Sequence, residues 1–265
     1  MSSIDQLFSD LRSKNKKALM PFLTAGDPDI ATTGAIIRAI GDAGADLCEV
    51  GVPYSDPIAD GPVIQASYQR ALDRKFKLQE IFEMGSELKS EVATPLVTMV
   101  SYAIIYRVGL AKYIAQAKAA GYAGAIVPDL LVEEAAEMSK ICAGEDFSLI
   151  QLVTPTTTRD RQVRIAELSS GFLYYVSVTG ITGERTALPT DLVDNVGWLR
   201  EQTELPICIG FGISSAETAK QLAPVADGLI VGSALVRRIA AAETQDAKVQ
   251  AAATFVKELR VAIDE

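Results

Sequence analysis

Histidine is absent from this chain of 265 residues. Because histidine is the side chain that most often serves as a general base, acid–base chemistry near neutral pH must use carboxylates, tyrosine, lysine or cysteine. Cysteine is scarce as well, since only Cys48, Cys142 and Cys208 occur and no two of them have CxxC spacing. We therefore expect no zinc site, and no metal site is predicted.

Positive charge is in the minority, with 25 lysines and arginines against 34 aspartates and glutamates, for a formal net charge of −9. The chain has no basic run that could neutralise a phosphate backbone, which argues against a nucleic-acid-binding protein. The composition is 49% hydrophobic and 22% charged, as in a folded globular protein rather than a disordered one.

Long apolar runs are missing too. The first 19 residues contain no apolar core of a secretory signal, and no stretch reaches the roughly 18 apolar residues of a membrane span. We expect a cytoplasmic protein that does not enter the membrane. The N-terminus instead places Ile4, Leu7, Phe8 and Leu11 on one face of a short amphipathic helix.

Short apolar runs alternate with segments of helical period along the whole chain. Near-continuous apolar runs are typical of parallel strands buried on both faces. The eight runs are residues 18–24, 45–51, 95–102, 123–128, 147–154, 172–178, 205–210 and 227–232. The helices predicted between them include 30–43, 109–120, 132–143 and 159–169, each followed by a glycine that we interpret as its stop signal: Gly44, Gly121, Gly144 and Gly171.

Eight such units at this length predict an α/β fold, a (βα)8 TIM barrel with an extra N-terminal helix and a further helix at 78–90. No linker or low-complexity segment interrupts the pattern, so residues 1–265 are predicted to form a single catalytic domain. The alternative is a doubly wound open sheet, which is disfavoured because no GxGxxG follows the first strand.

Three carboxylates gather in the stretch EVGVPYSDPIADG, residues 49–61. Glu49 ends the second strand and Asp60 lies in the following loop, where barrel enzymes place their active sites. Desolvation after an apolar run should raise the pKa of Glu49, so that it carries a proton near neutral pH. Asp60 should stay ionised, whereas Asp56 before Pro57 is interpreted as a turn or cap residue.

Glycine-rich loops follow the last strands: GFGISS at 210–215, and VGSAL at 231–235, which opens a helix. Small residues and a helix N-terminus allow backbone N–H groups to hold an anion, and barrels often bind phosphate at these two loops. The loop TGITGERT at 179–186 could add a third edge or act as a lid. The alternative for each loop is ordinary turn chemistry.

Further side chains fall near strand ends. Phe22 and Thr24 end the first strand, and Tyr102 is predicted to end the third. Because side chains alternate along a strand, only one of Tyr174 and Tyr175 can point into the barrel. Together these residues could form an aromatic pocket for a flat apolar ring, or they could equally be packing at the top of the barrel.

Several longer motifs resemble one known family. The stretches PFLTAGDP (21–28), EVGVPYSDPIADGPVIQ (49–65), TGITGERTAL (179–188), GFGIS (210–214) and VGSALV (231–236) occur in this order. They are similar to those of the tryptophan synthase alpha subunit, over almost the whole chain from about residue 4 to 260. The run D-P-x-A-D-G-P-x-I-Q is highly specific.

The resemblance implies a (βα)8 lyase that cleaves indole-3-glycerol phosphate to indole and glyceraldehyde 3-phosphate in tryptophan biosynthesis. It implies three catalytic residues: Glu49, Asp60 and Tyr174, the last chosen over Tyr175 by counting back from Ser177 and Gly180. It implies a substrate site formed by Phe22, Thr24, Tyr102, Thr182, Gly183, Phe211, Gly212, Ile213, Gly232 and Ser233.

The resemblance also implies a partner, a beta subunit that uses pyridoxal phosphate to join indole to serine in an alpha2-beta2 heterotetramer. This chain itself would need no cofactor. One departure stands at the expected partner face near Asp56 and the 102–108 loop, where Ile104 replaces a polar contact residue of many members.

Three alternatives stay open at this point. The first is a stand-alone indole-releasing lyase without a partner, which the departure at Ile104 motivates. The second is a regulatory barrel that binds a phosphate ligand and activates a partner with weak catalysis of its own. The third is another phosphate-binding barrel, an isomerase or an aldolase, because a fold does not fix a function.

Overall fold

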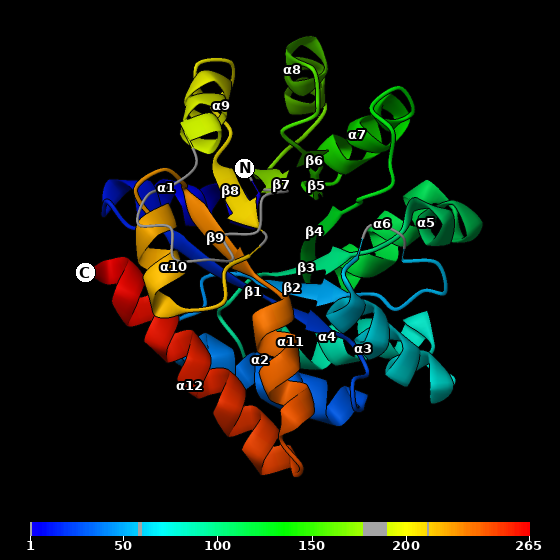
Figure 1. The fold of residues 1–265 in the computed structure, drawn as a ribbon. Coiled ribbons are helices and arrows are strands. Elements are labelled where there is room, and N and C mark those ends of the chain that lie inside the picture. Colours follow the sequence, from blue (N-terminus) through cyan, green and yellow to red (C-terminus); the bar gives the residue numbers. More distant parts are fainter. Residues whose placement is uncertain (1, 58–59, 177–189, 211) are drawn as a thin grey trace.

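Nine parallel strands form one sheet in the computed structural model, which describes residues 2–57, 60–176, 190–210 and 212–265. The order is β5-β4-β3-β2-β1-β9-β8-β7-β6. Its two end strands, β5 (Ser148–Ile150) and β6 (Leu152–Val153), are separated in the chain only by Gln151. The sheet therefore returns on itself as a barrel, with helices arranged around it (Figure 1).

All eight apolar runs are strands, and the predicted fifth strand corresponds to β5 and β6 together, so the (βα)8 barrel is confirmed. The other strands are β1 (Ala18–Thr24), β2 (Cys48–Gly51), β3 (Leu96–Met99), β4 (Tyr122–Ile126), β7 (Leu173–Val176), β8 (Ile207–Gly210) and β9 (Gly228–Val231). The helices are α1 (Ser3–Ser13), α2 (Ile30–Asp42), α3 (Pro62–Asp73), α4 (Leu78–Leu88), α5 (Tyr102–Val108), α6 (Leu110–Ala119), α7 (Ala135–Gly144), α8 (Arg159–Glu167), α9 (Thr190–Arg200), α10 (Ala216–Leu222), α11 (Ser233–Ala241) and α12 (Gln245–Asp264).

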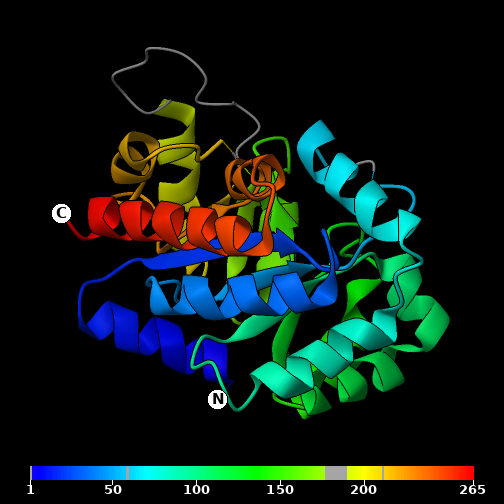
Figure 2. The same cartoon turned by 90° about the horizontal axis from the view of Figure 1, so that it is seen from below.

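The apolar strands serve two separate cores. Along β1, Ala18 and Met20 face the barrel interior, while Leu19 and Leu23 face the outer layer under the helices. Every residue of β1 is buried, because the sheet is covered on both sides. In the outer layer, α12 lies beside α2 and α11 (Figure 2).

Helix α1 covers the end of the barrel at which the strands begin. Its buried face is Ile4, Phe8 and Leu11, and the Phe8 ring centroid lies 5.9 Å from that of Phe172, just before β7. Ser2 caps the helix and accepts a hydrogen bond from Asp5 N at 3.2 Å. The extra N-terminal helix is thus confirmed, and it covers the interior core at the end of the barrel where the strands begin.

Two of the four predicted stop glycines stand just past a helix end, whereas Gly171 lies three residues beyond the C-cap of α8, Leu168, and Gly144 lies inside α7. Gly44 and Gly121 have φ of 103° and 91°, a left-handed conformation in which glycine avoids the Cβ clash. Gly144, however, is the last residue of α7, and the left-handed residue there is Asp146, with φ of 49°. The prediction of Gly144 as a stop was wrong, and α7 begins at Ala135 rather than at Val132.

The third strand is shorter than predicted, because a polar cap intervenes. β3 ends at Met99, and Ser101 caps α5 by accepting from Ala103 N at 3.3 Å. Asp129, which follows β4, accepts from the Ser101 hydroxyl at 2.6 Å and from Tyr102 N at 2.7 Å. Tyr102 is therefore the first residue of a helix, not the end of a strand.

Among the described residues, no helix combines the length and the apolar character needed to cross a membrane.

Candidate active site

The carboxyl ends of the parallel strands meet at the barrel end opposite α1, and Glu49 lies there in β2. It stands in register with Phe22 of β1 and Val97 of β3. The side chain is 0% exposed, and neither carboxyl oxygen has a hydrogen-bond partner among the described residues. Burial raises the pKa of Glu49 well above its ordinary value, so the group holds a proton near neutral pH.

The raised pKa of Glu49 links folding stability to pH. A buried carboxyl that is neutral when folded costs nothing extra below its unfolded pKa, but stability is lost as pH rises toward the folded pKa. We expect wild type and Glu49→Gln to have similar unfolding midpoints at pH 5, and the variant to be the more stable at pH 8. Thermal unfolding at both pH values measures this, and a difference that does not change with pH would contradict it.

The surroundings of Asp60 differ from those of Glu49. It is half-buried in the loop before α3, and Gln65 donates from its side chain to the Asp60 backbone oxygen at 2.8 Å and to that of Pro57 at 3.2 Å. Burial raises the pKa of Asp60 to about 6. At neutral pH the site therefore combines one neutral carboxyl, Glu49, with one carboxylate, Asp60, which can stabilise positive charge.

Tyr174 of β7 is the tyrosine that faces the barrel interior, whereas Tyr175 packs in the outer layer. Burial raises the pKa of Tyr174 well above its ordinary value, and Glu49 and Asp60 raise it further when they are ionised. Its hydroxyl therefore stays protonated and lies close enough to interact electrostatically with both carboxyl groups. Gly210 at the end of β8 makes room for it, since an added Cβ would lie 2.3 Å from the Tyr174 hydroxyl.

Phe22 covers the strand ends from β1, and a glycine gives it space. A Cβ on Gly51 would lie 2.5 Å from Cζ of Phe22. The ring belongs to an apolar group with Ile64, Tyr68 and Val236, against which Tyr54, Val63 and Met99 pack. Of the residues predicted to form an aromatic pocket, only Phe22 belongs to this apolar group.

Replacing Gly51 with alanine should therefore disturb the site. We expect Gly51→Ala to force the Phe22 ring aside, to lower stability by about 1–3 kcal/mol, and to weaken substrate binding. The matched control is Gly197→Ala in α9, where an added Cβ meets nothing within 4 Å and a helix favours alanine. Denaturant unfolding and KM measure both effects, and equal behaviour of the two variants would contradict the argument.

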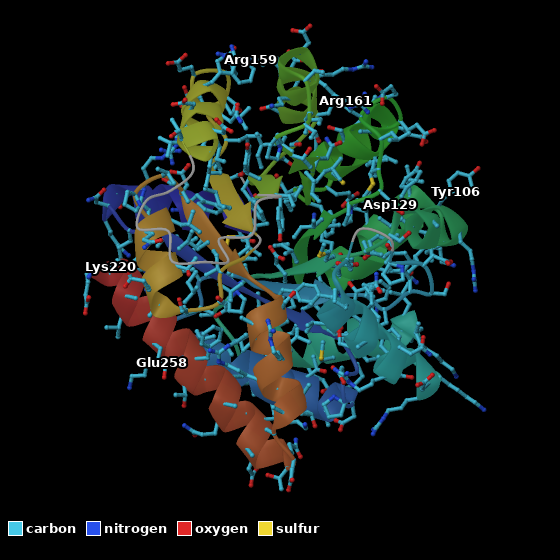
Figure 3. The ribbon with its side chains drawn as sticks, viewed as in Figure 1. Tyr106, Asp129, Arg159, Arg161, Lys220 and Glu258 are labelled. Carbon is cyan, nitrogen blue, oxygen red and sulfur yellow. The ribbon has the colours of Figure 1, made fainter. Side chains whose placement is uncertain are left out.

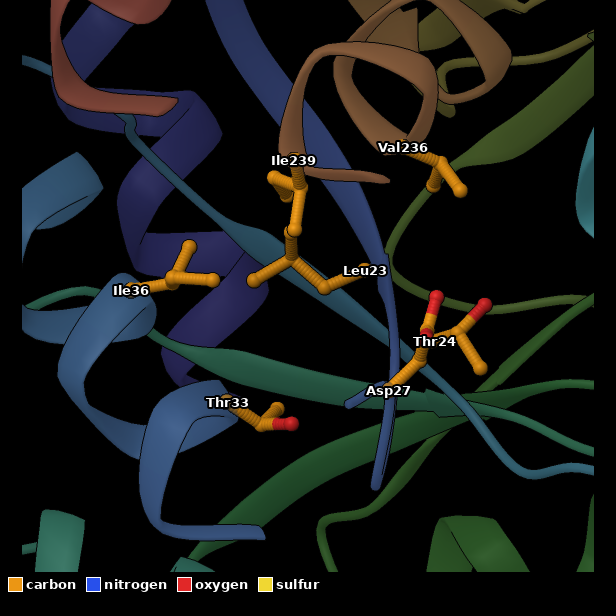
Figure 4. Close-up of a pocket in the computed structure, with 7 residues that line it drawn as sticks. All are labelled: Leu23, Thr24, Asp27, Thr33, Ile36, Val236 and Ile239. Atoms are coloured by element: carbon orange, nitrogen blue, oxygen red, sulfur yellow. The ribbon is translucent and has the colours of Figure 1, made fainter. Parts of the chain in front are cut away.

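Thr24 ends β1 but its hydroxyl is engaged by α3. It shares a hydrogen bond of 2.6 Å with the Ser67 hydroxyl, and Arg70 of the same helix makes a two-pronged ion pair with Asp27 at 2.8 and 2.6 Å. A small cavity borders this contact on the outer side of β1 (Figure 4). It lies between β1, α2 and α11 and is lined by Leu23, Thr24, Asp27, Thr33, Ile36, Val236 and Ile239. Thr24 thus ties β1 to the helix that follows Asp60.

The two predicted phosphate loops follow β8 and β9, and they are neighbours because these two strands pair with each other. β9 also pairs with β1, the strand that carries Phe22. Gly212 has φ of 82°, Ile213 is buried, and Ser233 is the first residue of α11, after Gly232. The N-terminus of α11 thus opens beside Phe22, which an added Cβ on Gly232 would approach to 3.7 Å. Backbone N–H groups and the helix dipole make this a suitable anion site.

Three predicted substrate residues, Thr182, Gly183 and Phe211, lie outside the described residues. Tyr102 is not part of the apolar group around Phe22. Its side chain packs against the outer core, and its ring centroid lies 6.1 Å from that of Tyr106. Burial raises the pKa of Tyr102, and the charges of Glu134 and Glu137 raise it further. Tyr106 itself is 71% exposed at the edge of the molecule (Figure 3).

Sequence reasoning missed Tyr68, which lies 2% exposed among the site residues. A signal was present: Ile64, Ser67, Tyr68 and Ala71 have the spacing of one helix face, and all four are buried. No metal cluster is present in the described part of the chain, where no three histidine, cysteine, aspartate or glutamate side chains gather as ligands.

Comparison with known proteins gives one consistent result. The family model for the tryptophan synthase alpha chain matches residues 8–264. The chain belongs to the tryptophan synthase alpha chain family. It is 69% identical over 276 residues to the alpha chain of Rhodopirellula baltica, with 100% of this chain and 99% of that one covered. It is 45% identical over 264 residues to that of Synechocystis, covering 99% and 100%.

Solved structures agree with the tryptophan synthase alpha chain assignment. The alpha subunit from Legionella pneumophila is similar with a TM-score of 0.91 and 34% identity, over 100% of this chain and 99% of that one. A ligand-free tryptophan synthase from Mycobacterium tuberculosis is similar with a TM-score of 0.90 and 29% identity, over 100% of both. The chain is accordingly a lyase that cleaves indole-3-glycerol phosphate to indole and glyceraldehyde 3-phosphate, in a family that is generally free of cofactors.

Proposed function

We propose that Glu49 and Asp60 carry out the retro-aldol cleavage of indole-3-glycerol phosphate, with Tyr174 beside them. The observation that carries this proposal is the buried carboxyl of Glu49, which has no partner among the described residues, together with a second carboxyl, Asp60, whose pKa is about 6; both act on Tyr174. A neutral acid and an ionised group are the two forms that the reaction needs at neutral pH.

The steps follow from these protonation states. Indole C3 must be protonated before its bond to the glycerol chain can break, and protonated Glu49 supplies this proton. The positive charge that develops on the ring is stabilised by Asp60, which accepts a hydrogen bond from the indole N–H. The Glu49 carboxylate then takes the proton from the neighbouring glycerol hydroxyl as the C–C bond breaks, which gives indole and an aldehyde and restores the acid. Tyr174 offers a protonated hydroxyl next to both groups.

The far end of the substrate is held by its phosphate. We assign the phosphate contacts to Gly183, Gly212, Ile213, Gly232 and Ser233, with Thr182 and Phe211 as further substrate-binding residues. The opening of α11 beside Phe22 supports this arrangement. Anchoring both ends orients the bond that breaks, which can lower a barrier substantially.

The partner, on this proposal, is a tryptophan synthase beta subunit in an alpha2-beta2 heterotetramer, with pyridoxal phosphate only in that subunit. The tryptophan synthase structures from Mycobacterium tuberculosis support it, one of them in an aminoacrylate-bound form. The docking face would include Asp56 and the 102–108 segment, where exposed Tyr106 and half-buried Ile104 lie. We further propose one catalytic domain over residues 1–265, located in the cytoplasm.

Indole release from indole-3-glycerol phosphate tests the proposal, with and without a beta subunit. We expect slow release by the chain alone and a faster rate when the partner is added. High activity without co-elution on size exclusion would favour a stand-alone lyase. Activation of the partner without any indole release would favour a regulatory barrel instead.

A further inference from the structure

The loop that carries Asp60 is held by a side chain that the reaction scheme does not use, the amide of Gln65. Its nitrogen Nε2 donates to the backbone oxygen of Asp60 at 2.8 Å and to that of Pro57 at 3.2 Å. The backbone N–H of Asp60 also donates to the Pro57 oxygen, at 3.1 Å. One amide group of α3 therefore holds both Pro57 and Asp60, the two residues that this backbone hydrogen bond joins.

These two hydrogen bonds serve the loop rather than the start of the helix. The unpaired groups at a helix N-terminus are N–H donors, which need an acceptor. The Gln65 amide is a donor here, and Gly61, the N-cap of α3, has no side chain that could accept. The Gln65 side chain therefore contributes nothing to capping, and its hydrogen bonds fix the loop carbonyls against the helix instead.

Helix α3 is itself tied to β1 by side chains. The Ser67 hydroxyl donates its single hydrogen to the Ile64 carbonyl at 2.7 Å, so the Thr24 hydroxyl is the donor in the 2.6 Å hydrogen bond between Thr24 and Ser67. Arg70, one turn further along α3, holds Asp27 through two hydrogen bonds. β1 in turn pairs with β2, the strand that carries the buried glutamate. Gln65 thus projects from a helix that is fixed relative to both strands.

The exposure of Gln65 shows what its hydrogen bonds can contribute. Because the side chain is exposed, water could take its place as a donor to the Asp60 and Pro57 carbonyls, and the net gain in folding stability is small. Water cannot, however, keep both carbonyls at a fixed distance from α3. The contribution of Gln65 is therefore to the position of the loop, and with it to the position of the carboxyl group of Asp60.

We propose that Gln65 is a positioning residue that holds the Asp60 loop against α3 and so aims the Asp60 carboxylate at the indole N–H. This inference rests on the proposed function, in which Asp60 accepts that hydrogen bond. On this proposal Gln65 makes no contact with the substrate and acts only through Asp60.

The test is Gln65→Met, which retains the length of the side chain and the helix propensity of the position but removes both donors. We expect kcat for indole release to fall about tenfold, because a small displacement of a group that stabilises charge is costly in the transition state. KM should change little, since the phosphate contacts lie on other loops. Steady-state kinetics separates the two parameters.

The acidic limb of the pH profile gives a second readout. Burial raises the pKa of Asp60 to about 6, and the titratable groups that interact with it electrostatically are the phenols of Tyr54, Tyr68 and Tyr174, which are neutral at this pH. A loop released from α3 exposes the carboxyl group to water, so the limb of Gln65→Met should move to lower pH. A general loss of stability would not move it.

The matched control is Gln69→Met, one turn further along α3. The Gln69 amide is also exposed and donates to the Asp73 side chain at 2.6 Å, so the same chemical change removes a hydrogen bond that does not reach the loop. This variant should retain the kcat and the acidic limb of wild type. Circular dichroism should show both methionine variants folded.

A double-mutant cycle with Asp60→Asn separates this inference from the proposed function. If the inference holds, Gln65→Met lowers kcat no further once Asp60 is replaced. If Gln65→Met retains the kcat of wild type, leaves the acidic limb in place, or adds its full effect to that of Asp60→Asn, the positioning role is wrong and the proposed function stands. If Asp60→Asn itself leaves kcat unchanged, both are wrong.

Discussion

Glu49→Gln is expected to lower kcat for indole release by about a thousandfold, in the range measured for lost general acid–base catalysis. The amide is of similar size and stays neutral, as the buried carboxyl does, so the fold should persist. It cannot deliver a proton to indole C3 or take one from the glycerol hydroxyl. Steady-state kinetics with a colorimetric indole assay measures the loss, and KM should change little because the phosphate and ring contacts stay.

The matched control for this prediction is Glu258→Gln on the exposed side of α12 (Figure 3). It makes the same chemical change at a solvated position and should leave kcat unaltered. Activity of Glu49→Gln within a few-fold of wild type, with an intact fold by circular dichroism, would remove Glu49 from the reaction.

Asp60→Asn should lower kcat by about a hundredfold or more, the usual cost of removing one group that stabilises charge in a transition state. The asparagine retains size but can no longer balance the positive charge on the ring. In wild type, kcat/KM should rise with pH through about 6 as Asp60 loses its proton, because burial raises its pKa to that value. The variant should lose this acidic limb.

The comparison for Asp60 is Asp73→Asn at the other end of α3, where the carboxylate is exposed and accepts from Gln69 at 2.6 Å. Its rate and pH profile should match wild type. An acidic limb near pH 6 that survives in Asp60→Asn would show that another group titrates there.

Much of the fold could be predicted because parallel strands buried on both faces leave an unmistakable pattern. Each apolar run is a strand, and the interior and exterior sides alternate as in β1. The ends of elements were less predictable because they depend on distant polar groups. Asp129 caps the turn after β3 from the loop that follows β4, which makes Tyr102 the start of a helix rather than the end of a strand.

In the candidate site, too, some residues could be predicted from local sequence and others depend on the fold. Glu49 and Asp60 could be predicted because a carboxylate directly after an apolar run, and a second one in the next loop, stand out locally. The spacing along α3 indicates that Tyr68 is buried, but only the fold shows that it lies beside Gly51 at the end of β2. The burial that separates the pKa values of the two carboxyl groups is likewise a property of the folded barrel.

The central claim is that one substrate spans the two carboxyl groups and the α11 N-terminus. A crystal structure of Glu49→Gln with indole-3-glycerol phosphate tests it most directly, because the variant should bind without turning over. The account predicts the indole N–H on Asp60, C3 next to residue 49, and the phosphate against residues 212–213 and 232–233. A phosphate bound elsewhere, or an indole ring that does not reach Asp60, would contradict it.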